Sequence, residues 1–586
     1  MPNPGDSFLA RCTEAAEHFL QTVVVIDNEA EFGDGPNSDT PRVAQRARTE
    51  LLATSDEGSS VASGEAHARP RGRTEMPSQA AAGGQLTAPP ETPAETVAAT
   101  IPPDAPVSHR LNAKTLTDAF GDRSVLCTVY KPGPGEQMVE RAGKIALHAD
   151  IVVVDWHLES GSSVMAKAII SDILRKDAGR KGRLRLIAIY TAQPDMVGLA
   201  EDLRKYLAGL SLPFEDQGGG VLTAPGVRIV FLEKAGVKRP PGSLAPQELP
   251  SRLIQEFARL SNGILPAVAL QSIAAIRDWS HHILATFHSD LDAAFVLHRC
   301  LLPFPDDAES FAVRLISAEL ASLLGSNDVG RYAGLDVKKD WVAARQPRPE
   351  GFPVGAEFVS VADLHAWLER GKAGPPLPQQ ADKKNYEVLA EALYGSAETA
   401  RDRCLELARI SCLKREAYSR RSAASNKPPM LSLGTIVRPL PNERKEYTRA
   451  LGPEVFLLCI QPACDSVRIG GQRPYPFQRL KRSDSLFNVV LKLGDDTDAR
   501  LLVTGSPYLT EMFTFRSASA QEDFVLAHAD DHRFVFTDVE DHRFEWLADL
   551  NDFTAQWAMA QIGTRVNTPG LDQFEWLRRK GPKGPG

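Results

Sequence analysis

The strongest constraint on the fold is the segment at residues 149–158, Ala-Asp-Ile-Val-Val-Val-Asp-Trp-His-Leu, in which an apolar, β-branched run ends at Asp155. The run shows no alternation of polar and apolar positions, so it predicts a parallel strand that is buried on both faces. Parallel α/β sheets place their chemistry at the carboxyl ends of the strands. Asp155 is therefore expected where such a sheet would hold a reacting carboxylate.

Four further segments have the character of strands and alternate with helical patterns. The expected strands are 22–29, 125–130, 183–191 and 227–234, and the expected helices are 6–20, 111–120, 135–148, 162–176, 196–210 and 246–260. Helices that follow strands in turn are typical of a parallel sheet with helices on both faces. The sequence thus predicts an α/β, doubly wound, five-stranded parallel sheet.

A long segment interrupts this pattern after the first strand. Residues 31–108 are rich in Pro, Gly, Ser, Ala and Thr and contain almost no aromatic residues. Such a segment cannot bury enough apolar surface to offset the entropy lost on ordering. We expect a disordered insertion, apart from a helix around 41–53, so that residues 1–30 and 109–262 make up one domain.

The ends of four expected strands carry a specific set of side chains, Asp27, Asp155, Thr191 and Lys234. Their types and order resemble the receiver domain of bacterial two-component response regulators, over about residues 20–262 with the insertion removed. The resemblance implies that Asp155 is the phosphoacceptor and that Lys234 pairs with the phosphoryl charge. It also implies that Thr191 donates a hydrogen bond to a phosphoryl oxygen.

The resemblance further implies a magnesium site and a switch residue. Asp27 and Asp155 would hold Mg²⁺, a hard cation that prefers carboxylate oxygens. Phe231, three residues before the lysine, falls at the aromatic switch position of the family. Receivers usually have two adjacent acids after the first strand, whereas this chain has Asp27-Asn28, so Glu29 is a further candidate metal ligand.

Two other departures separate the chain from the receiver pattern. Lys234 is followed by Ala235 and not by proline, and the connection before the last strand is long and contains three consecutive glycines at 218–220. A folded pseudo-receiver, which binds a partner without being phosphorylated, is therefore the alternative to a working phosphoacceptor. Another kind of α/β domain also stays open.

The rest of the chain predicts two different architectures. Residues 263–345 have helical periodicity, and 346–428 indicate a proline-rich linker followed by one long helix over 386–417. Residues 429–580 contain short strand signals at 434–440, 454–461, 486–493, 499–504, 512–516, 524–527 and 534–537, then helices at 546–562 and 571–579. We expect an α+β, mainly antiparallel domain there.

Other chemically suggestive residues have simpler explanations. His281, His282 and His288 could serve phosphotransfer in a helical bundle but are more often ordinary bundle histidines. Cys459 and Cys464, with Cys404 and Cys412 upstream, lack the usual spacing of zinc ligands. Asp530, Asp531 and His532 would more often form a turn than a catalytic site.

Net charge, hydropathy and cysteine content limit the kinds of partner and the compartment that we expect for this chain. The formal net charge of −8 gives no electrostatic footprint for nucleic acid, and no apolar run is long enough for a membrane span. The first residues lack the pattern of a signal peptide, and seven scattered cysteines suit a reducing compartment. We therefore expect a cytoplasmic protein without membrane or nucleic-acid partners.

The resemblance to response-regulator receivers implies a two-component response regulator, and not a classical enzyme. A histidine kinase would supply the phosphoryl group to Asp155 in a Mg²⁺-dependent reaction, and the C-terminal half would deliver the output. A homodimer is a further expected assembly. The alternatives are a pseudo-receiver scaffold or adaptor acting by protein–protein contact, an enzyme with a centre near His532, and a DNA-binding regulator.

Overall fold

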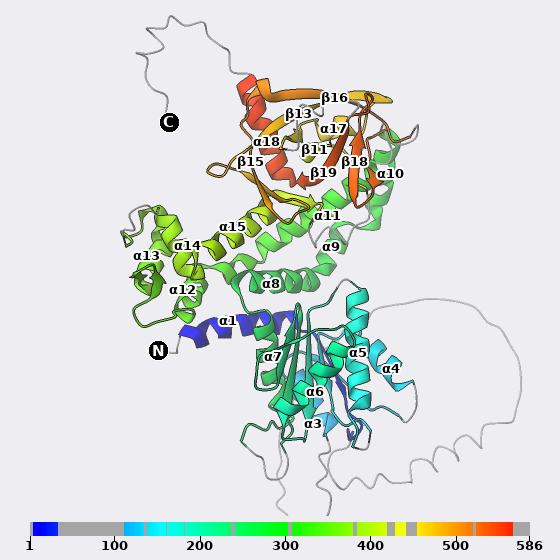
Figure 1. The fold of residues 1–586 in the computed structure, drawn as a ribbon. Helices are drawn as coiled ribbons and strands as arrows, with labels where there is room; N and C mark the ends of the chain where they lie inside the picture. Colours follow the sequence, from blue (N-terminus) through cyan, green and yellow to red (C-terminus); the bar gives the residue numbers. More distant parts are fainter. Residues whose placement is uncertain are drawn as a thin grey trace, which may run out of the picture. The chain divides into compact units, whose positions relative to one another are not determined.

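The computed structural model describes most of the chain in two compact units (Figure 1). The described residues are 4–32, 111–133, 137–159, 161–180, 182–235, 241–302, 307–378, 384–418, 428–440, 454–519 and 523–566. One unit comprises Gln21–Asp177 and Leu184–Leu253, and the other comprises Met1–Leu20, Ala178–Arg183 and Ile254–Gly586. Nearly all of the expected insertion at 31–108 lies outside the described residues, as do the helices expected at 41–53 and 571–579. Within the described ranges, no helix combines the length and apolar character needed to cross a membrane.

The first unit is built on a mixed, seven-stranded sheet in the order β2-β1-β3-β4-β7-β6-β5. Its parallel strands are β1 (Thr22–Ile26), β2 (Leu126–Tyr130), β3 (Ile151–Val154), β4 (Arg185–Thr191) and β7 (Val227–Glu233). The antiparallel strands β5 (Glu215–Asp216) and β6 (Val221–Ala224) extend it beyond β7. The expected five-stranded, wholly parallel sheet is therefore corrected to a mixed sheet of seven.

The two unexpected strands come from the long connection before β7. Gly218, Gly219 and Gly220 have φ angles of +80°, +60° and +78°, a region that side chains with a Cβ rarely enter. This turn folds 215–224 back as a hairpin, and the N–H of Phe231 donates to the carbonyl of Gly220. The three glycines were the sequence signal for this hairpin.

Helices lie between the strands and bury both sides of the parallel sheet. They are α3 (Ala113–Gly121), α4 (Met138–Ala146), α5 (Val164–Gly179), α6 (Met196–Gly209) and α7 (Leu249–Leu260). Asn112 caps α3 by accepting from the N–H of Thr115, and Asp195 caps α6 by accepting from that of Gly198. Every residue of β3 and β4 is buried, as expected for strands covered on both faces.

Charged groups hold the strands where they begin. Arg185, at the start of β4, is wholly buried, donates two hydrogen bonds to Asp177, and also reaches the carbonyls of Ala146 and Ala149. Asp150, just before β3, accepts from the N–H of Thr22 at the start of β1. These contacts align the starts of the strands and so fix the register on which the opposite edge depends.

The second unit begins with α1 (Pro4–Phe19), which packs on α8 and α12. Its helices continue through α8 (Ile264–Asp278), α9 (Ser280–Thr286), η1 (Ser289–Leu291), α10 (Asp292–Leu301), α11 (Asp307–Ser326), η2 (Val329–Ala333) and α12 (Leu335–Ala344). Tyr332 closes the packing with a hydrogen bond from its hydroxyl to Glu14, 3.0 Å away. The α-helical character expected for 263–345 agrees with these elements.

Residues 346–428, expected to be a linker and one long helix, contain more structure than the sequence predicted. Phe352 and Val354 of β8 (Phe352–Val354) are buried beside β9 (Glu357–Val359), α13 (Val361–Arg370) and α14 (Asn385–Tyr394). Gly395, with φ of +78°, ends α14, and α15 (Ala397–Cys412) begins as a separate helix.

The C-terminal part of this unit is a ten-stranded antiparallel sheet with apolar cores on both faces. Its strands are β10 (Leu413–Glu416), β11 (Thr435–Pro439), β12 (Phe456–Cys459), β13 (Gln472–Arg482), β14 (Val489–Lys492), β15 (Asp498–Leu502), β16 (Thr510–Arg516), β17 (His528–Asp530), β18 (Arg533–Thr537) and β19 (Arg543–Leu550). The expected helix at 546–562 is wrong at its start, because β19 runs to Leu550 and α18 covers Asp552–Val566. The strand expected at 524–527 is only an isolated bridge at Leu526.

Candidate functional site

Four of the residues singled out in the sequence lie at the carboxyl edge of the parallel strands. Asp27 follows β1, Asp155 follows β3, Thr191 ends β4 and Lys234 follows β7. The N–H of Asp155 donates to the carbonyl of Ile26, and that of Lys234 donates to the carbonyl of Thr191. Hydrogen bonds of the sheet ladder therefore continue to Asp155 and Lys234 and fix the backbone positions of these two residues.

Lys234 joins the two carboxylates. Its Nζ lies 2.8 Å from Oδ2 of Asp27 and 2.6 Å from Oδ2 of Asp155. Asp27 and Lys234 are buried, whereas Asp155 is partly open to solvent. Burial lowers the pKa of Lys234, but the charges and hydrogen bonds of Asp155 and Asp27 outweigh it and leave the pKa above its ordinary value. The site therefore holds a charged ammonium between two acids.

The carboxylates also accept backbone hydrogen bonds. Oδ1 of Asp27 accepts from the N–H of Glu29 at 2.8 Å, and Oδ1 of Asp155 accepts from that of His157 at 3.3 Å. A carboxylate has about four acceptor positions, so each acid keeps capacity for a further ligand. The side chain of Glu29 is exposed.

Asn28, which directly follows Asp27 in the sequence, carries an unsatisfied side-chain oxygen. Its side-chain Oδ1 is buried and has no hydrogen-bond partner among the described residues. Leaving such an acceptor unpaired in the folded protein costs about 1–3 kcal/mol, so this buried oxygen needs an explanation. Amide and carboxylate oxygens are both ligands that Mg²⁺ or Ca²⁺ accepts.

Thr191 and Phe231 differ in their surroundings. Thr191 is buried, and its Oγ1 accepts from the N–H of Gln193 at 3.4 Å, which leaves the hydroxyl proton available as a donor. Phe231 is also buried, and its ring meets that of Trp156 edge-on, with centroids 5.6 Å apart. The ring of Phe231, at the expected switch position, thus packs against Trp156, the residue that follows Asp155.

Sequence reasoning missed several side chains around the site. Lys234 lies 5.6 Å from the ring centroid of Tyr190, and burial, followed by the charge of Asp27, raises the pKa of that tyrosine. Lys167 lies 5.6 Å from the ring centroid of Trp156 and pairs with Asp202 at 2.6 Å. Tyr190 directly precedes Thr191 and Trp156 directly follows Asp155, which was the available signal.

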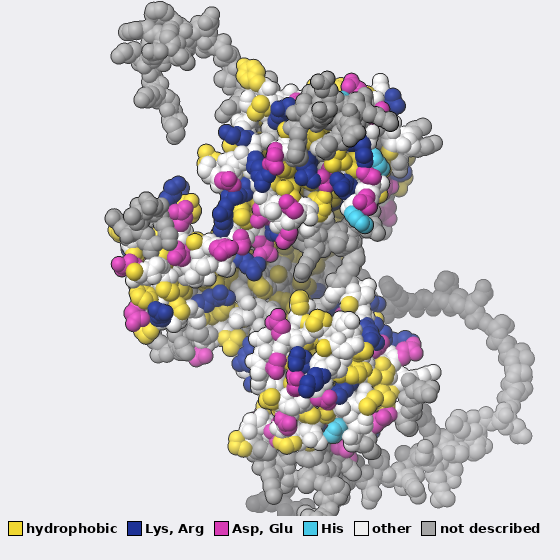
Figure 2. All heavy atoms as spheres, viewed as in Figure 1, with side chains coloured by type: hydrophobic (Ala, Val, Ile, Leu, Met, Phe, Trp, Pro, Cys, Tyr) yellow, Lys and Arg dark blue, Asp and Glu magenta, His cyan; other side chains and the backbone are white. Residues whose placement is uncertain are grey.

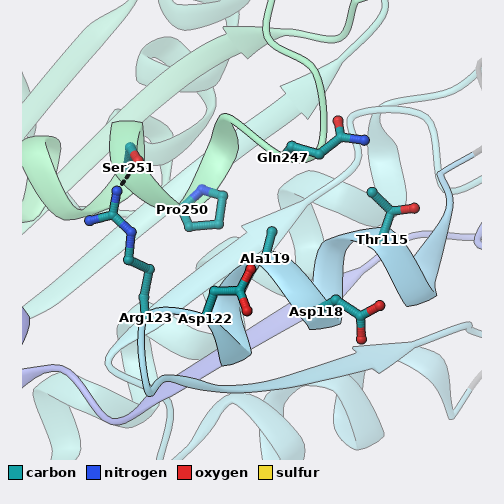
Figure 3. Close-up of a pocket in the computed structure, with 8 residues that line it drawn as sticks. All are labelled: Thr115, Asp118, Ala119, Asp122, Arg123, Gln247, Pro250 and Ser251. Atoms are coloured by element: carbon teal, nitrogen blue, oxygen red, sulfur yellow. Dashed lines mark hydrogen bonds between the residues drawn. The ribbon is translucent and has the colours of Figure 1, made fainter.

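A separate pocket of about 340 Å³ lies between α3 and α7 (Figure 3). It is lined by Thr115, Asp118, Ala119, Asp122, Arg123, Gln247, Pro250 and Ser251. Arg123 donates from Nη2 to Oγ of Ser251 at 2.7 Å, which ties the two helical segments together. None of the strand-end residues lines this pocket.

The other candidate residues are not gathered into a site. His281, His282 and His288 are exposed, and so is His532. Cys412 and Cys459 are buried, whereas Cys404 and Cys464 are exposed. In the part of the chain that the structure describes, no group of three or more His, Cys, Asp and Glu side chains is arranged to hold a metal.

One polar pair in the C-terminal sheet escaped the sequence reading. Nδ1 of buried His542 lies 2.7 Å from Oδ2 of Asp538, in the turn between β18 and β19. Oδ1 of the same aspartate accepts from the N–H of His542 at 2.7 Å. These hydrogen bonds close the turn.

On the face visible in Figure 2, acidic and basic side chains are interspersed.

Comparison with known families agrees with this geometry. The family model of the response receiver domain matches residues 19–239, from the last residue of α1 to just beyond Lys234. No curated protein matches the chain. The match ends before α7 and covers none of residues 240–586, while the strand ends that it includes carry two acids, a threonine and a lysine. Residues 19–239 are therefore a divergent response receiver domain.

Proposed function

We propose that this chain is a two-component response regulator whose receiver accepts a phosphoryl group on Asp155. The observation that carries the proposal is the position of Asp155, which is partly exposed and bound at 2.6 Å by a charged lysine. Asp27, its buried neighbour, is closed off from solvent and shares the same lysine. Asp155 is thus the carboxylate that a phosphodonor can reach.

The reaction is a transfer from nitrogen to oxygen. An Oδ atom of Asp155 attacks the phosphorus of a phosphohistidine on a histidine kinase, the P–O bond forms, and the P–N bond breaks. The departing ring, protonated on its other nitrogen, takes the bonding electron pair and leaves as neutral imidazole. Lys234 is already beside the acceptor oxygen and pairs with the phosphoryl oxygens, and the hydroxyl of Thr191 donates to one of them.

Mg²⁺ fits the oxygen donors at this edge. Asp27, Asp155 and Asn28 would hold it, and the unsatisfied Oδ1 of Asn28 supports its inclusion. The exposed side chain of Glu29 makes it a weaker candidate than Asn28. Bound Mg²⁺ supplies positive charge that offsets the charge of the phosphoryl oxygens.

Phosphorylation would act on the rest of the protein through Thr191 and Phe231. New negative charge at Asp155 draws the threonine hydroxyl toward it, and the ring of Phe231 would shift against Trp156. The output would come from the C-terminal half through an altered contact with a partner. Both the output and the switch rest on the phosphoacceptor role.

The second candidate is a pseudo-receiver scaffold or adaptor that binds a partner without being phosphorylated. Asn28 favours it, because an amide in place of a carboxylate lowers the negative charge available to a metal. Lys234 bridging both acids is also compatible with a purely structural role, since its ammonium offsets one of the two negative charges and joins the strand ends.

Intact mass spectrometry separates the two candidates. The full chain is incubated with Mg²⁺ and a small-molecule phosphodonor, beside Asp155→Asn and the matched exposed-site control Glu29→Gln. A working receiver gains one phosphoryl group in the wild type and in Glu29→Gln but not in Asp155→Asn. If none of the three proteins gains a phosphoryl group, even with candidate histidine kinases as donors, the result supports the pseudo-receiver scaffold.

A further inference from the structure

The backbone around Lys234 is held by hydrogen bonds to Leu244. The N–H of Ala235 donates to the carbonyl of Leu244 at 2.9 Å, and the N–H of Leu244 donates to the carbonyl of Glu233 at 2.8 Å. Lys234 itself pairs with Leu244 in a parallel bridge. A proline in place of Ala235 would have no N–H and could not donate the first of these hydrogen bonds. The backbone on both sides of Lys234 is therefore attached to that of Leu244.

The hydroxyl of Tyr190 anchors the same carbonyl of Leu244. It donates to this oxygen at 2.7 Å, so the oxygen accepts from both Tyr190 and Ala235, one hydrogen bond for each of its two lone pairs. Tyr190 is only 2% exposed. Burial raises the pKa of Tyr190, so the hydroxyl keeps its proton at neutral pH and remains a donor. A side chain of β4 thus fixes the segment that brackets Lys234.

The ring of Tyr190 lies beside the ammonium of Lys234. Nζ of Lys234 lies over the face of this ring, 5.6 Å from its centroid. Both side chains are buried, which strengthens the attraction between a cation and an aromatic face because little water competes for the cation. Two of the three N–H donors of the ammonium go to Asp27 and Asp155. The ring thus fills a further side of the ammonium and keeps Lys234 directed at the two carboxylates.

We propose that Tyr190 is a positioning residue for Lys234. Its hydroxyl fixes the backbone around the lysine through Leu244, and its ring holds the ammonium where it meets the phosphoryl oxygens as they transfer to Asp155. A charge that is in place before the transfer begins needs no reorganisation during it. The role rests on the proposed phosphoacceptor function of Asp155. Tyr190 acts through Lys234 and not on the reacting oxygen itself.

Amine labelling of the full chain tests the position of Lys234 without any phosphoryl transfer. In Tyr190→Leu, which removes ring and hydroxyl, an N-hydroxysuccinimide ester should acetylate Lys234 about tenfold faster than in the wild type, because the ring no longer covers the ammonium. Tyr190→Phe keeps the ring, so its acetylation rate should stay within about twofold of the wild type. Maleimide labelling of buried Cys127, on β2 of the same sheet, should stay slow in both variants.

Hydrogen exchange isolates the part played by the hydroxyl. Tyr190→Phe removes one of the two donors to the carbonyl of Leu244. Exchange in peptides that contain Ala235 and Leu244 should therefore be faster in this variant than in the wild type, while peptides from β3 should be unchanged.

The kinetics of phosphorylation test the consequence for the reaction. With Mg²⁺ and a small-molecule phosphodonor, Tyr190→Leu should lower the maximum rate of phosphorylation about tenfold and leave the half-saturating donor concentration within about twofold of the wild type. Tyr190→Phe should recover most of this rate. The control Tyr475→Phe removes another buried hydroxyl that donates to a backbone carbonyl, that of Ser466 at 3.2 Å, and should leave both constants unchanged.

The outcomes separate the positioning role from the proposed function. Unchanged acetylation of Lys234 in Tyr190→Leu would overturn the positioning role, whether or not the wild type is phosphorylated. So would faster acetylation with an unchanged maximum rate, or early reaction of Cys127, which would mean that Tyr190 serves stability alone. Faster acetylation in a chain whose wild type takes up no phosphoryl group would overturn only the proposed function and leave Tyr190 holding the lysine.

Discussion

The ammonium nitrogen of Lys234 lies 2.6 Å from Oδ2 of Asp155, although the two residues are 79 positions apart in the sequence. The same nitrogen lies 2.8 Å from Oδ2 of Asp27, which is 207 positions away. One cation thus holds the ends of three strands together. The following predictions test what this contact and its surroundings do.

Replacing Lys234 by methionine should lower the free energy of unfolding by about 3–5 kcal/mol, because it leaves two carboxylates without their cation. Added Mg²⁺ should restore more stability in this variant than in the wild type. Urea unfolding, monitored by hydrogen exchange of peptides from β1 and β3, measures both the loss of stability and its recovery with Mg²⁺. The control Lys205→Met removes a lysine that pairs with Glu201 at 3.4 Å on the surface, and it should lower the free energy of unfolding far less than Lys234→Met does. Equal losses in the two variants would contradict a bridging role.

Asn28→Asp should raise the affinity for Mg²⁺ by about tenfold, ~1.4 kcal/mol, because it adds a negative charge to the oxygen donors. Asn28→Ala should lower that affinity, since it removes the unsatisfied Oδ1. Isothermal titration calorimetry of the full chain with Mg²⁺ alone gives both values. Glu29→Gln serves as the control and should bind like the wild type. An effect of Glu29→Gln larger than that of Asn28→Ala would move the third ligand to Glu29.

Arg185→Met should destabilise the receiver by about 3–5 kcal/mol, because Asp177 and the carbonyls of Ala146 and Ala149 lose a buried donor. The matched change Arg204→Met removes an exposed pair with Glu201 and should lower the free energy of unfolding far less than Arg185→Met does. The same urea and hydrogen-exchange measurement compares them. A small loss in Arg185→Met would show that apolar packing can replace this pair.

Three of the seven cysteines should react with a maleimide under native conditions. Cys300, Cys404 and Cys464 are exposed. Burial raises the pKa of Cys127 and Cys459 to about 12, and it also raises the pKa of Cys12 and Cys412 above the ordinary 9.0. Because the thiolate is the nucleophile, these four should stay unmodified at neutral pH. Mass spectrometry should show three adducts on the native protein, and seven after denaturation. Early reaction at Cys127 would contradict the receiver core.

The stability of the C-terminal sheet should depend on Asp549. Burial raises the pKa of this carboxyl above its ordinary 3.8, against the hydrogen bond from Trp546 and the charge of Arg415. A raised pKa means tighter proton binding in the folded state, so the stabilisation is present below pH 3.8 and is lost as pH rises through the folded pKa. Asp549→Asn should therefore show a smaller fall in the free energy of unfolding between about pH 4 and about pH 7. Parallel profiles of variant and wild type would refute this.

The sequence predicted the parallel strands well because each is a short, largely apolar run, and β3 and β4 are buried at every residue. The expected strand 125–130 became Leu126–Tyr130, and 183–191 became Arg185–Thr191. The ends of the other three parallel strands, β1, β3 and β7, then located Asp27, Asp155 and Lys234. The β5–β6 hairpin was missed because its residues are few and partly polar, and its glycines suggested only a loop.

The C-terminal sheet was predicted less well for two physical reasons. Pro474 and Pro476 lie within β13, and proline cannot donate to a ladder, so the longest strand of the sheet gave no strand signal. Residues 543–550 form a strand buried along most of its length, whose apolar run reads equally well as a helix. The bridging position of Lys234 and the unsatisfied oxygen of Asn28 depend on side-chain geometry, which periodicity cannot supply.

The most direct test of the central claim is to locate the phosphoryl group itself. After incubation with Mg²⁺ and a phosphodonor, borohydride converts an aspartyl phosphate to homoserine, which tandem mass spectrometry places in the peptide sequence. Homoserine at position 155, absent from Lys234→Met or strongly reduced in it, is the predicted result. An unmodified Asp155, or a phosphoryl group on another residue, would contradict the assignment and leave the receiver as a scaffold.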